Sequence, residues 1–359
     1  MERRLRILIW HIHGSYLNAL ARLDHDWYLP VKPGRPPRYT GRGPTFDLPP
    51  TVREVPAEQV RHLSFDLVIH QTPENFFEDQ YAILSREQRA LPCIYLEHNT
   101  PRPHPCDTRH PVDEPTVLLV HVTHYNRLMW DCGRTPTQVI EHSVAIDPRV
   151  RYRGELERGM TLVNGLARRG RLAGCDLFLW MRERLPLDLA GMESEQLGGL
   201  GDIPYRQLHR RLAAYRFLFS PMRYSSLPLA VIEAMTIGMP VVALATTALP
   251  TVITHGVHGY LSCDPDELLA GMRRLLQDAA HARRLGEQAR RLALTRFGLE
   301  RFRRDWERAF ARALALRQAV VGGRESESES EALQPGKGIS LAADGAARPI
   351  AMPQRSEQQ

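Results

Sequence analysis

The sequence has no apolar run long enough to cross a membrane and no sign of a disulfide framework. None of its segments approaches the roughly 18 uninterrupted apolar residues that a membrane-spanning helix requires. Residues 1–4 lead directly into an apolar run that reads as a strand instead of a signal peptide. The 5 cysteines follow no ligand-like spacing, so reduced thiols are expected. We therefore expect a cytoplasmic protein.

Histidine is frequent in the first half of the chain, but the motifs of metal enzymes are missing. His11 and His13 share one predicted strand, and His121 and His124 lie near the end of another. A zinc hydrolase site built from these side chains is one alternative interpretation. No zincin motif or paired carboxylate spacing accompanies them. We predict neither a metal nor a cofactor.

Length and composition suit a soluble globular protein with two domains. The 359 residues allow two domains of about 150 residues each, followed by a tail. The formal charge of +6 comes mainly from arginine. Charge of this sign suits a diphosphate ligand, an anionic membrane surface or nucleic acid, and charge alone does not distinguish among the three.

The first half of the chain shows the alternation that is typical of a parallel α/β domain. Short apolar runs predict four strands, at residues 5–10, 67–69, 93–96 and 117–120. Helical or irregular pieces separate them, as in a sheet with crossover helices. Residues 30–50 are rich in Pro, Gly and Arg and predict a long exposed loop. We predict one Rossmann-like domain over residues 1–147.

The second half repeats this alternation and ends in a tail of different composition. The predicted elements are a strand at 160–163, a helical region ending near 185, a strand at 187–190 and a helix at 205–215. Together they predict a second Rossmann-like domain over residues 156–300. Residues 320–359 lack apolar periodicity and include a Glu-Ser run, so a disordered tail is expected.

Residues 217–261 form the most informative stretch. They read as a buried strand, a serine-rich turn, a helix that contains Glu233, and a second buried strand. Hydroxyl groups of the turn can cap the helix while Pro228 occupies its first turn. Free N–H groups at a helix N-terminus attract phosphate, and Glu233 one turn later is placed to accept hydrogen bonds from sugar hydroxyls. The ordinary alternative is a strand, turn and helix of any doubly wound domain.

This stretch resembles the nucleotide-sugar site of the retaining family 4 glycosyltransferases. The similar segments are Ser225–Leu229, Glu233–Met235, Gly238–Ala243 and Gly256–Leu261, with a weaker similarity at 139–144. The family has two glutamates eight positions apart, and Glu233 matches the second, which binds the ribose of the donor. The first glutamate falls on Ser225 and the glycine after it on Ser226, so this chain departs from the family where the donor sugar is held.

The resemblance implies the GT-B architecture, an α/β fold in which two Rossmann-like domains face a central cleft. It also implies a last helix, residues 301–318, that packs back towards the first domain. The implied reaction moves a sugar from a nucleotide-sugar donor to an acceptor hydroxyl with retention of anomeric configuration and without a catalytic metal. In the family's usual account, cations and a helix dipole stabilise the leaving diphosphate, which helps to deprotonate the acceptor.

The resemblance further implies roles for individual residues. His98 would be catalytic, because its imidazole would donate a hydrogen bond to developing negative charge. A loop facing the cleft on the acceptor side would contain His13, Gly14 and Ser15. The family's lysine position falls on Ala173. The expected donor-binding residues are Glu233, Ser225, Ser226, Leu229, Ala230, Arg169 and Arg171. Ordinary turn, cap and solvated-loop roles are the alternatives for these residues.

Two other functions fit the same motifs. One is a GT-B-fold nucleotide-sugar epimerase, and the other is a non-catalytic nucleotide-sugar-binding homologue that has lost the first glutamate. The expected partners are a nucleotide-sugar donor and a carbohydrate or lipid-linked acceptor. Peripheral contact with an anionic membrane is an option, and no nucleic acid is expected.

Overall fold

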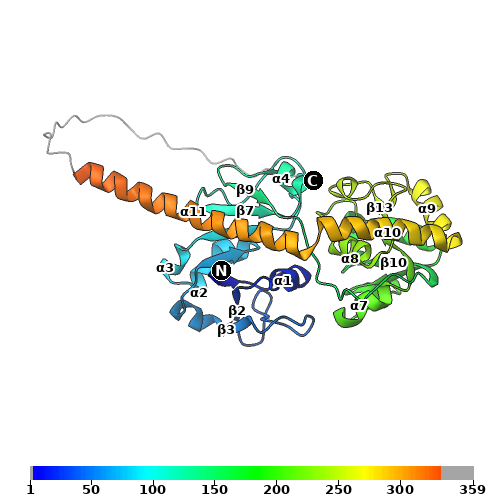
Figure 1. The fold of residues 1–359 in the computed structure, drawn as a ribbon, viewed down its shortest axis with the longest axis horizontal. Coiled ribbons are helices and arrows are strands. Elements are labelled where there is room, and N and C mark those ends of the chain that lie inside the picture. The colour runs from blue at the N-terminus through cyan, green and yellow to red at the C-terminus, as the bar shows by residue number, and fades with distance from the viewer. Residues whose placement is uncertain (1–2, 333–359) are drawn as a thin grey trace, which may run out of the picture. The chain divides into compact units, whose positions relative to one another are not determined.

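Two parallel β-sheets organise the protein, one in each half of the chain (Figure 1). The computed structural model describes residues 3–332. Every neighbouring pair of strands in both sheets is parallel. In spatial order, the first sheet consists of β3 (Val52–Pro56), β2 (Asp26–Val31), β1 (Arg6–Ile9), β4 (Leu67–His70), β5 (Cys93–Glu97), β7 (Val117–His121) and β9 (Thr137–Val139).

The strands of the first sheet are short and largely buried on both faces. Each residue of β4 and β7 is buried, as expected for a parallel sheet with helices on both sides. The connecting elements are α1 (Gly14–Leu20), the 3-10 helix η1 (Ala57–His62), the π-helix η2 (Asn75–Asp79), α2 (Gln80–Ile83), α3 (Arg86–Arg89) and α4 (His124–Met129). A separate two-stranded sheet pairs β6 (Thr108–Arg109) with β8 (Trp130–Asp131).

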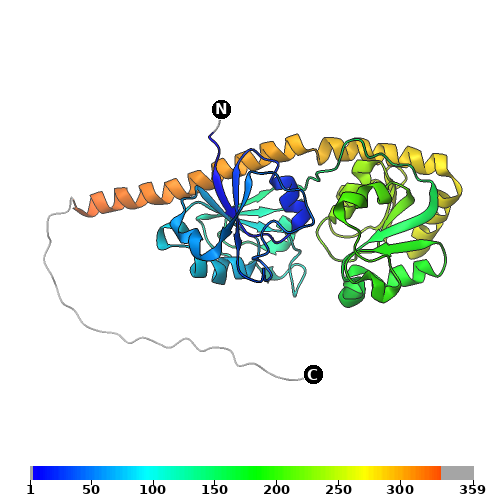
Figure 2. The same cartoon turned by 90° about the horizontal axis from the view of Figure 1, so that it is seen from below.

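The second sheet has the order β11 (Leu187–Ala190), β10 (Leu156–Leu162), β12 (Tyr215–Ser220), β13 (Val241–Leu244) and β14 (Gly259–Ser262). Figure 2 shows helices on both sides of its strands. These elements are α5 (Leu166–Ala173), α6 (Cys175–Arg182), the 3-10 helix η3 (Ser194–Leu197), α7 (Tyr205–Leu212), α8 (Leu229–Ile237), the 3-10 helix η4 (Leu249–Thr251), α9 (Pro265–Gln277) and α10 (Ala279–Arg296).

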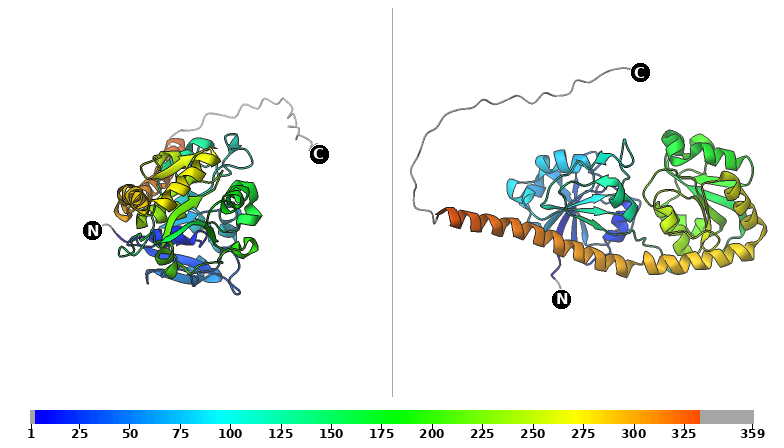
Figure 3. Two further views of the ribbon diagram at one scale, coloured as in Figure 1. Left: turned by 90° about the vertical axis from the view of Figure 1, so that its right-hand side faces the viewer. Right: turned by 90° about the horizontal axis from the view of Figure 1, so that it is seen from above.

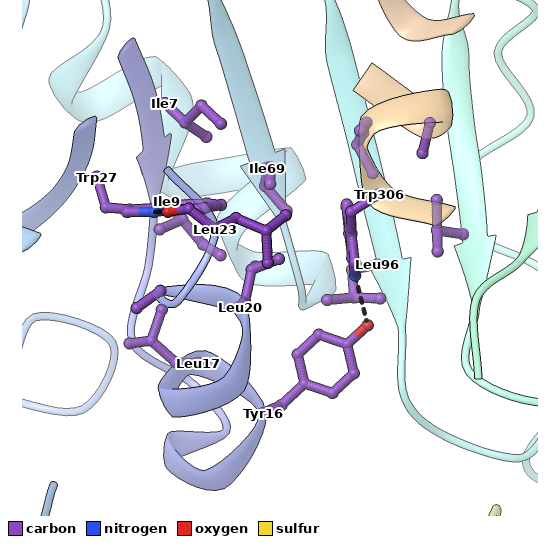
Figure 4. Packing of buried hydrophobic residues seen from close by; sticks show 14 of the residues in the cluster. Ile7, Ile9, Tyr16, Leu17, Leu20, Leu23, Trp27, Ile69, Leu96 and Trp306 are labelled. Carbon is purple, nitrogen blue, oxygen red and sulfur yellow. Dashed lines mark hydrogen bonds between the residues drawn. The ribbon is translucent and has the colours of Figure 1, made fainter. Parts of the chain in front are cut away.

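The last helix, α11 (Leu299–Ala332), begins after the second sheet and packs against the first (Figure 3). Its buried side chains Phe302, Trp306 and Phe310 join the core formed by β1, α1 and β4. The indole Nε1 of Trp306 donates a hydrogen bond of 3.2 Å to the hydroxyl of Tyr16 (Figure 4). Helix α11 therefore contributes side chains to the same core as β1, α1 and β4.

Several sequence-based expectations about local structure need correction. Strands β2 and β3 were not expected, and β2 includes the start of the predicted loop at 30–50. Helix α7 ends at Leu212, so residue 215 begins a strand instead of ending a helix. Helix α11 continues past residue 318, and the part of the predicted tail from 333 to 359 lies outside the described residues.

The predicted domain boundaries remain a prediction. Each sheet falls within one of the two predicted Rossmann-like regions, while residues up to 318 form one compact unit. Across residues 3–332, no helix combines the length and the apolar character that crossing a membrane would require.

Candidate functional site

A cavity of about 530 Å³ lies at the carboxyl ends of strands from both sheets. The first half of the chain contributes the turn after β1 and residues 45–46, and the second half contributes the ends of β10 and β11 and the helices α7 and α8. Open parallel sheets bind their ligands at this edge. The predicted site residues that line the cavity are His13, Gly14, Ser15, Leu229, Ala230 and Glu233.

Glu233 is a buried carboxylate, 4% exposed, in the second turn of α8. The hydroxyl of Tyr205 donates a hydrogen bond of 3.4 Å to its Oε1, and Nε2 of His209 lies 3.6 Å from the same oxygen. No hydrogen bond from the residues that the structure describes reaches Oε2. One carboxylate oxygen is therefore available to accept hydrogen bonds from a ligand in the cavity.

Tyr205 and His209 were not identified from the sequence as site residues. They lie on one face of α7, one turn apart, and their rings are in edge contact at 4.8 Å. Burial and the neighbouring Glu233 carboxylate raise the pKa of Tyr205, so its hydroxyl stays a donor at neutral pH. The ring of Phe46, from the other half of the chain, lies 4.5 Å from the ring of Tyr205. The rings of Phe46 and Tyr205 both line the cavity and form one of its walls.

The turn after β1 packs closely against the same wall. Gly14 opens α1, and a Cβ atom at this position would overlap the ring of Phe46. This close approach explains why glycine stands here. His13 precedes the helix without capping it, and its ring lies 4.1 Å from the ring of His98. The sequence-predicted cleft loop and the predicted catalytic histidine are thus neighbours.

His98 follows β5, and the hydrogen bonds around it fix which ring nitrogen carries the proton. The amide nitrogen of Gln71 donates to the carbonyl of Trp10 at 2.6 Å, so the amide oxygen faces His98 Nε2 at 2.9 Å. That oxygen can only accept, so Nε2 carries the proton and Nδ1 of the neutral ring can only accept. The expectation that His98 donates to developing negative charge therefore requires correction, because its free nitrogen is an acceptor.

Three imidazoles gather at this edge of the first sheet and are all held neutral. Burial, followed by the nearby His13 and His142, lowers the pKa of His98 well below its usual value. The pKa of His13 falls to about 4 through burial and the adjacent His11. The pKa of His142 falls to about 3 because of burial, His13 and Arg301. Hydrogen bonding by neutral rings is therefore the chemistry available here at physiological pH.

The two predicted donor-binding arginines differ in their surroundings. Arg171 forms an ion pair of 2.6 Å with Asp176, which also binds Arg223 at 2.6 Å. Arg169 is half-buried, and its guanidinium makes no hydrogen bond or ion pair with the residues described by the structure. Burial, and then the charges of Arg102 and Arg168, lower the pKa of Arg169. Neither predicted arginine lines the 530 Å³ cavity.

The serine-rich turn does not cap α8 as predicted. Pro228 is the N-cap residue, with φ −62° and ψ 127°, and no side chain caps the helix. The ψ of Pro228 lies outside the helical range although its φ is compatible with a helix, so the helix starts at Leu229, one residue later than the sequence indicated. Ser225 and Ser226 are half-buried and lie outside the cavity lining, while the carbonyl of Ser226 accepts from Thr247 Oγ1 at 3.5 Å.

The histidines of the alternative zinc site do not converge. Nδ1 of His11 lies 2.5 Å from the carbonyl oxygen of Gly41, and Nε2 of His121 lies 3.4 Å from Sγ of Cys132. His124 is exposed at the start of α4. Within the described part of the chain, no group of three or more His, Cys, Asp or Glu side chains is arranged to hold a metal ion.

Sequence comparison identifies part of the second half. Residues 192–292 match the family model described as "Glycosyl transferases group 1". The MMP alpha-(1->4)-mannosyltransferase of Mycolicibacterium hassiacum is 34% identical over 128 residues, which cover 34% of this chain. The same alignment spans 28% of the length of that curated relative.

Comparison with solved structures covers most of the chain. Sucrose-phosphate synthase from Thermosynechococcus elongatus aligns with 87% of this chain and 100% of its own, at a TM-score of 0.63 and 16% identity. The glycosyltransferase from Rickettsia africae aligns with 87% of this chain and 99% of its own, at a TM-score of 0.64 and 10% identity. Anabaena HepE in complex with UDP-glucose aligns with 87% of this chain and 100% of its own, at a TM-score of 0.60 and 15% identity. The predicted GT-B fold is confirmed, and the similarity to the glycosyl transferases group 1 model is limited to residues 192–292.

Proposed function

We propose that this protein is a retaining family 4 glycosyltransferase that moves a hexose from a nucleotide sugar to an acceptor hydroxyl. One observation carries the proposal, namely the buried Glu233 carboxylate that opens onto the cavity between the two sheets. The position of Glu233 inside the matched segment 192–292 supports the assignment. The match to the group 1 model supports the transferase class, and the mannosyltransferase relative supports a hexose.

The donor's ribose would lie against Glu233. Tyr205 donates its hydrogen bond to Oε1 of Glu233, so Oε2 would accept hydrogen bonds from the ribose hydroxyls. The aromatic wall of Tyr205 and Phe46 provides apolar surface for the base beside that ribose. The diphosphate would reach the first turn of α8, where Leu229 and Ala230 have backbone N–H groups that no side chain caps.

The reaction would break the bond between the anomeric carbon of the sugar and the oxygen of the diphosphate. Negative charge that builds on this oxygen would be stabilised by Arg169 and by the dipole of α8. The acceptor hydroxyl attacks from the face that the diphosphate leaves and passes its proton to a diphosphate oxygen. The neutral His98 would accept a hydrogen bond from a sugar hydroxyl through Nδ1 and so orient the ring.

The acceptor would enter past the turn at His13, Gly14 and Ser15, which lines the cavity on the side of the first sheet. We propose a carbohydrate or lipid-linked acceptor. Peripheral contact with an anionic membrane would suit the lipid-linked case and the formal charge of +6. Vesicles with and without anionic lipid would test this contact, because the bound fraction should rise only with the anionic lipid.

A second function, nucleotide-sugar binding without catalysis, is favoured by one observation. Ser225 stands where the family has a glutamate, and a hydroxyl cannot replace a carboxylate in charge-assisted bonds to the donor sugar. A protein of this kind would bind nucleoside diphosphates but would neither transfer nor hydrolyse the sugar. Measuring nucleotide binding and sugar transfer or hydrolysis across a panel of donors separates the two functions.

Substitution of Glu233 tests the proposed donor site. Calorimetric titration with UDP, GDP and ADP should identify a binding nucleotide for the wild-type protein. Glu233→Gln keeps the shape of the side chain but removes its charge, so affinity for that nucleotide should fall by about 1.5–3 kcal/mol, or tenfold to a hundredfold. Glu287→Gln, an exposed change on α10, is the matched control and should bind like wild type. Equal affinity of Glu233→Gln and wild type would refute the site.

A further inference from the structure

The loop that follows His98 is firmly held at its base. The backbone N–H of Asn99 donates to Oε1 of Glu97 at 2.6 Å, and the carbonyl of Asn99 accepts from the indole of Trp130 at 2.9 Å. Thr100 and Pro101 are buried, whereas Arg102 is exposed. The backbone that presents Arg102 is therefore anchored, although its guanidinium is free to reach a ligand.

Tyr224 joins this loop to the second half of the chain. Its hydroxyl donates a hydrogen bond of 3.0 Å to the carbonyl of Pro101, the residue before Arg102. Its backbone N–H, with that of Arg223, points to the carbonyl of Leu172 near the end of α5, at 3.4 and 3.1 Å. Tyr224 therefore connects the backbone beside Arg102 to the end of α5, the helix that carries Arg169.

The other arginines around this turn already have carboxylate partners. Arg168 binds Glu193 at 3.2 Å, while Arg171 and Arg223 share Asp176. Arg102 and Arg169 have no ion pair or side-chain hydrogen bond to any residue within the described part of the chain. Mutual repulsion of these two cations contributes, after burial, to the lowered pKa of Arg169. Guanidinium groups without a counter-ion are suited to bind an anion such as a diphosphate.

We propose that Arg102, from the first half of the chain, and Arg169, from the second, together bind the diphosphate of the donor. This inference rests on the proposed function, and it assigns the second cation of the donor site. Ala173, which falls on the family's lysine position, is fully buried and cannot present a cation to the cleft. Arg102 supplies that charge from across the cleft, so that the diphosphate bridges both halves of the protein.

The test compares ligands that differ only in phosphate. Nucleoside, nucleoside monophosphate and nucleoside diphosphate of the base that wild type binds are titrated into wild type, Arg102→Ala, Arg102→Lys and Arg169→Ala. Arg102→Ala should weaken diphosphate binding about tenfold to a hundredfold while nucleoside binding stays unchanged. Arg102→Lys should recover part of the loss, because the positive charge remains. Arg273→Ala, an exposed arginine of α9, is the matched control and should bind like wild type.

The double variant Arg102→Ala/Arg169→Ala adds a second readout. Two residues that hold one diphosphate should be coupled, so the combined loss should differ from the product of the single losses. Diphosphate affinity of Arg102→Ala within about twofold of wild type would overturn the proposal. If Glu233→Gln weakens binding in the same series, the donor site stands and only the role of Arg102 fails. If folded wild type binds no nucleoside diphosphate, both proposals fail.

Discussion

The buried imidazole of His142 should make the protein sensitive to acid. Both ring nitrogens are buried and have no hydrogen-bond partner among the described residues, and the ring packs 5.5 Å from that of Tyr16. Burial, with His13 and Arg301 nearby, lowers the pKa to about 3 from an ordinary value of 6.5. The unfolded chain takes up a proton below pH 6.5 while the folded protein does not. Stability is therefore lost as the pH falls from 6.5 towards 3 and is unaffected above this window.

The size of the effect follows from the two pKa values. At pH 5 the unfolded state gains about 2 kcal/mol from protonating this histidine, and the result changes little if the folded pKa is anywhere below about 4. His142→Phe removes the titrating group and keeps an aromatic ring in place. Between pH 7 and pH 5 the variant should therefore lose about 2 kcal/mol less unfolding free energy than wild type.

Urea unfolding at pH 7 and at pH 5 measures this difference, with the slope of each transition checked for two-state behaviour. The comparison uses the change with pH, so a constant packing cost of phenylalanine cancels. His104→Phe, an exposed histidine, is the control and should follow wild type. If His142→Phe and wild type lose the same free energy to within about 0.5 kcal/mol, His142 is not buried in its neutral form.

Two further predictions concern positioning and packing. Gln71→Leu leaves Nε2 of His98 and the carbonyl of Trp10 without their present partner, so the free energy of unfolding should fall by about 1–3 kcal/mol. In ¹⁵N NMR spectra, His98 should no longer be confined to its single Nε2–H tautomer. An unchanged spectrum would contradict this. Gly286 of α10 lies so close to the carbonyl of Gly238 that a Cβ atom would overlap it. Gly286→Ala should therefore lower the free energy of unfolding, measured with urea, by about 1–3 kcal/mol. An unchanged midpoint would contradict this packing.

Two of the strands that escaped sequence analysis, β2 and β3, contain a proline. β2 contains Pro30 and β3 ends at Pro56, and proline inside a short apolar run argues against a strand. In the folded protein β3 lies at the edge of the first sheet with β2 beside it. The central strands β1, β4, β5 and β7 were predicted correctly because they are continuous apolar runs buried on both faces.

The site was only partly predictable because some of its contacts are distant in sequence. Glu233 was identified within a local motif, whereas its partner Tyr205 lies 28 positions earlier and meets it only when α7 packs beside α8. Gln71 directly follows β4. Open α/β sheets bind ligands at the carboxyl ends of their strands, so the reasoning that identified residues after β1 and β5 could have identified Gln71 as well. Phe46 lies in a loop without periodicity, and no local pattern indicates that its ring reaches Tyr205.

The anomeric configuration of the product tests the central claim most directly. Wild-type protein is incubated with a panel of α-linked nucleotide sugars and candidate acceptors, and the new linkage is read by NMR from the coupling at the anomeric carbon. The proposed function predicts an α-linked product that forms with the wild type and is strongly reduced with Glu233→Gln. A β-linked product would contradict the retaining assignment, and binding of the donor without transfer to any acceptor would contradict the transferase itself.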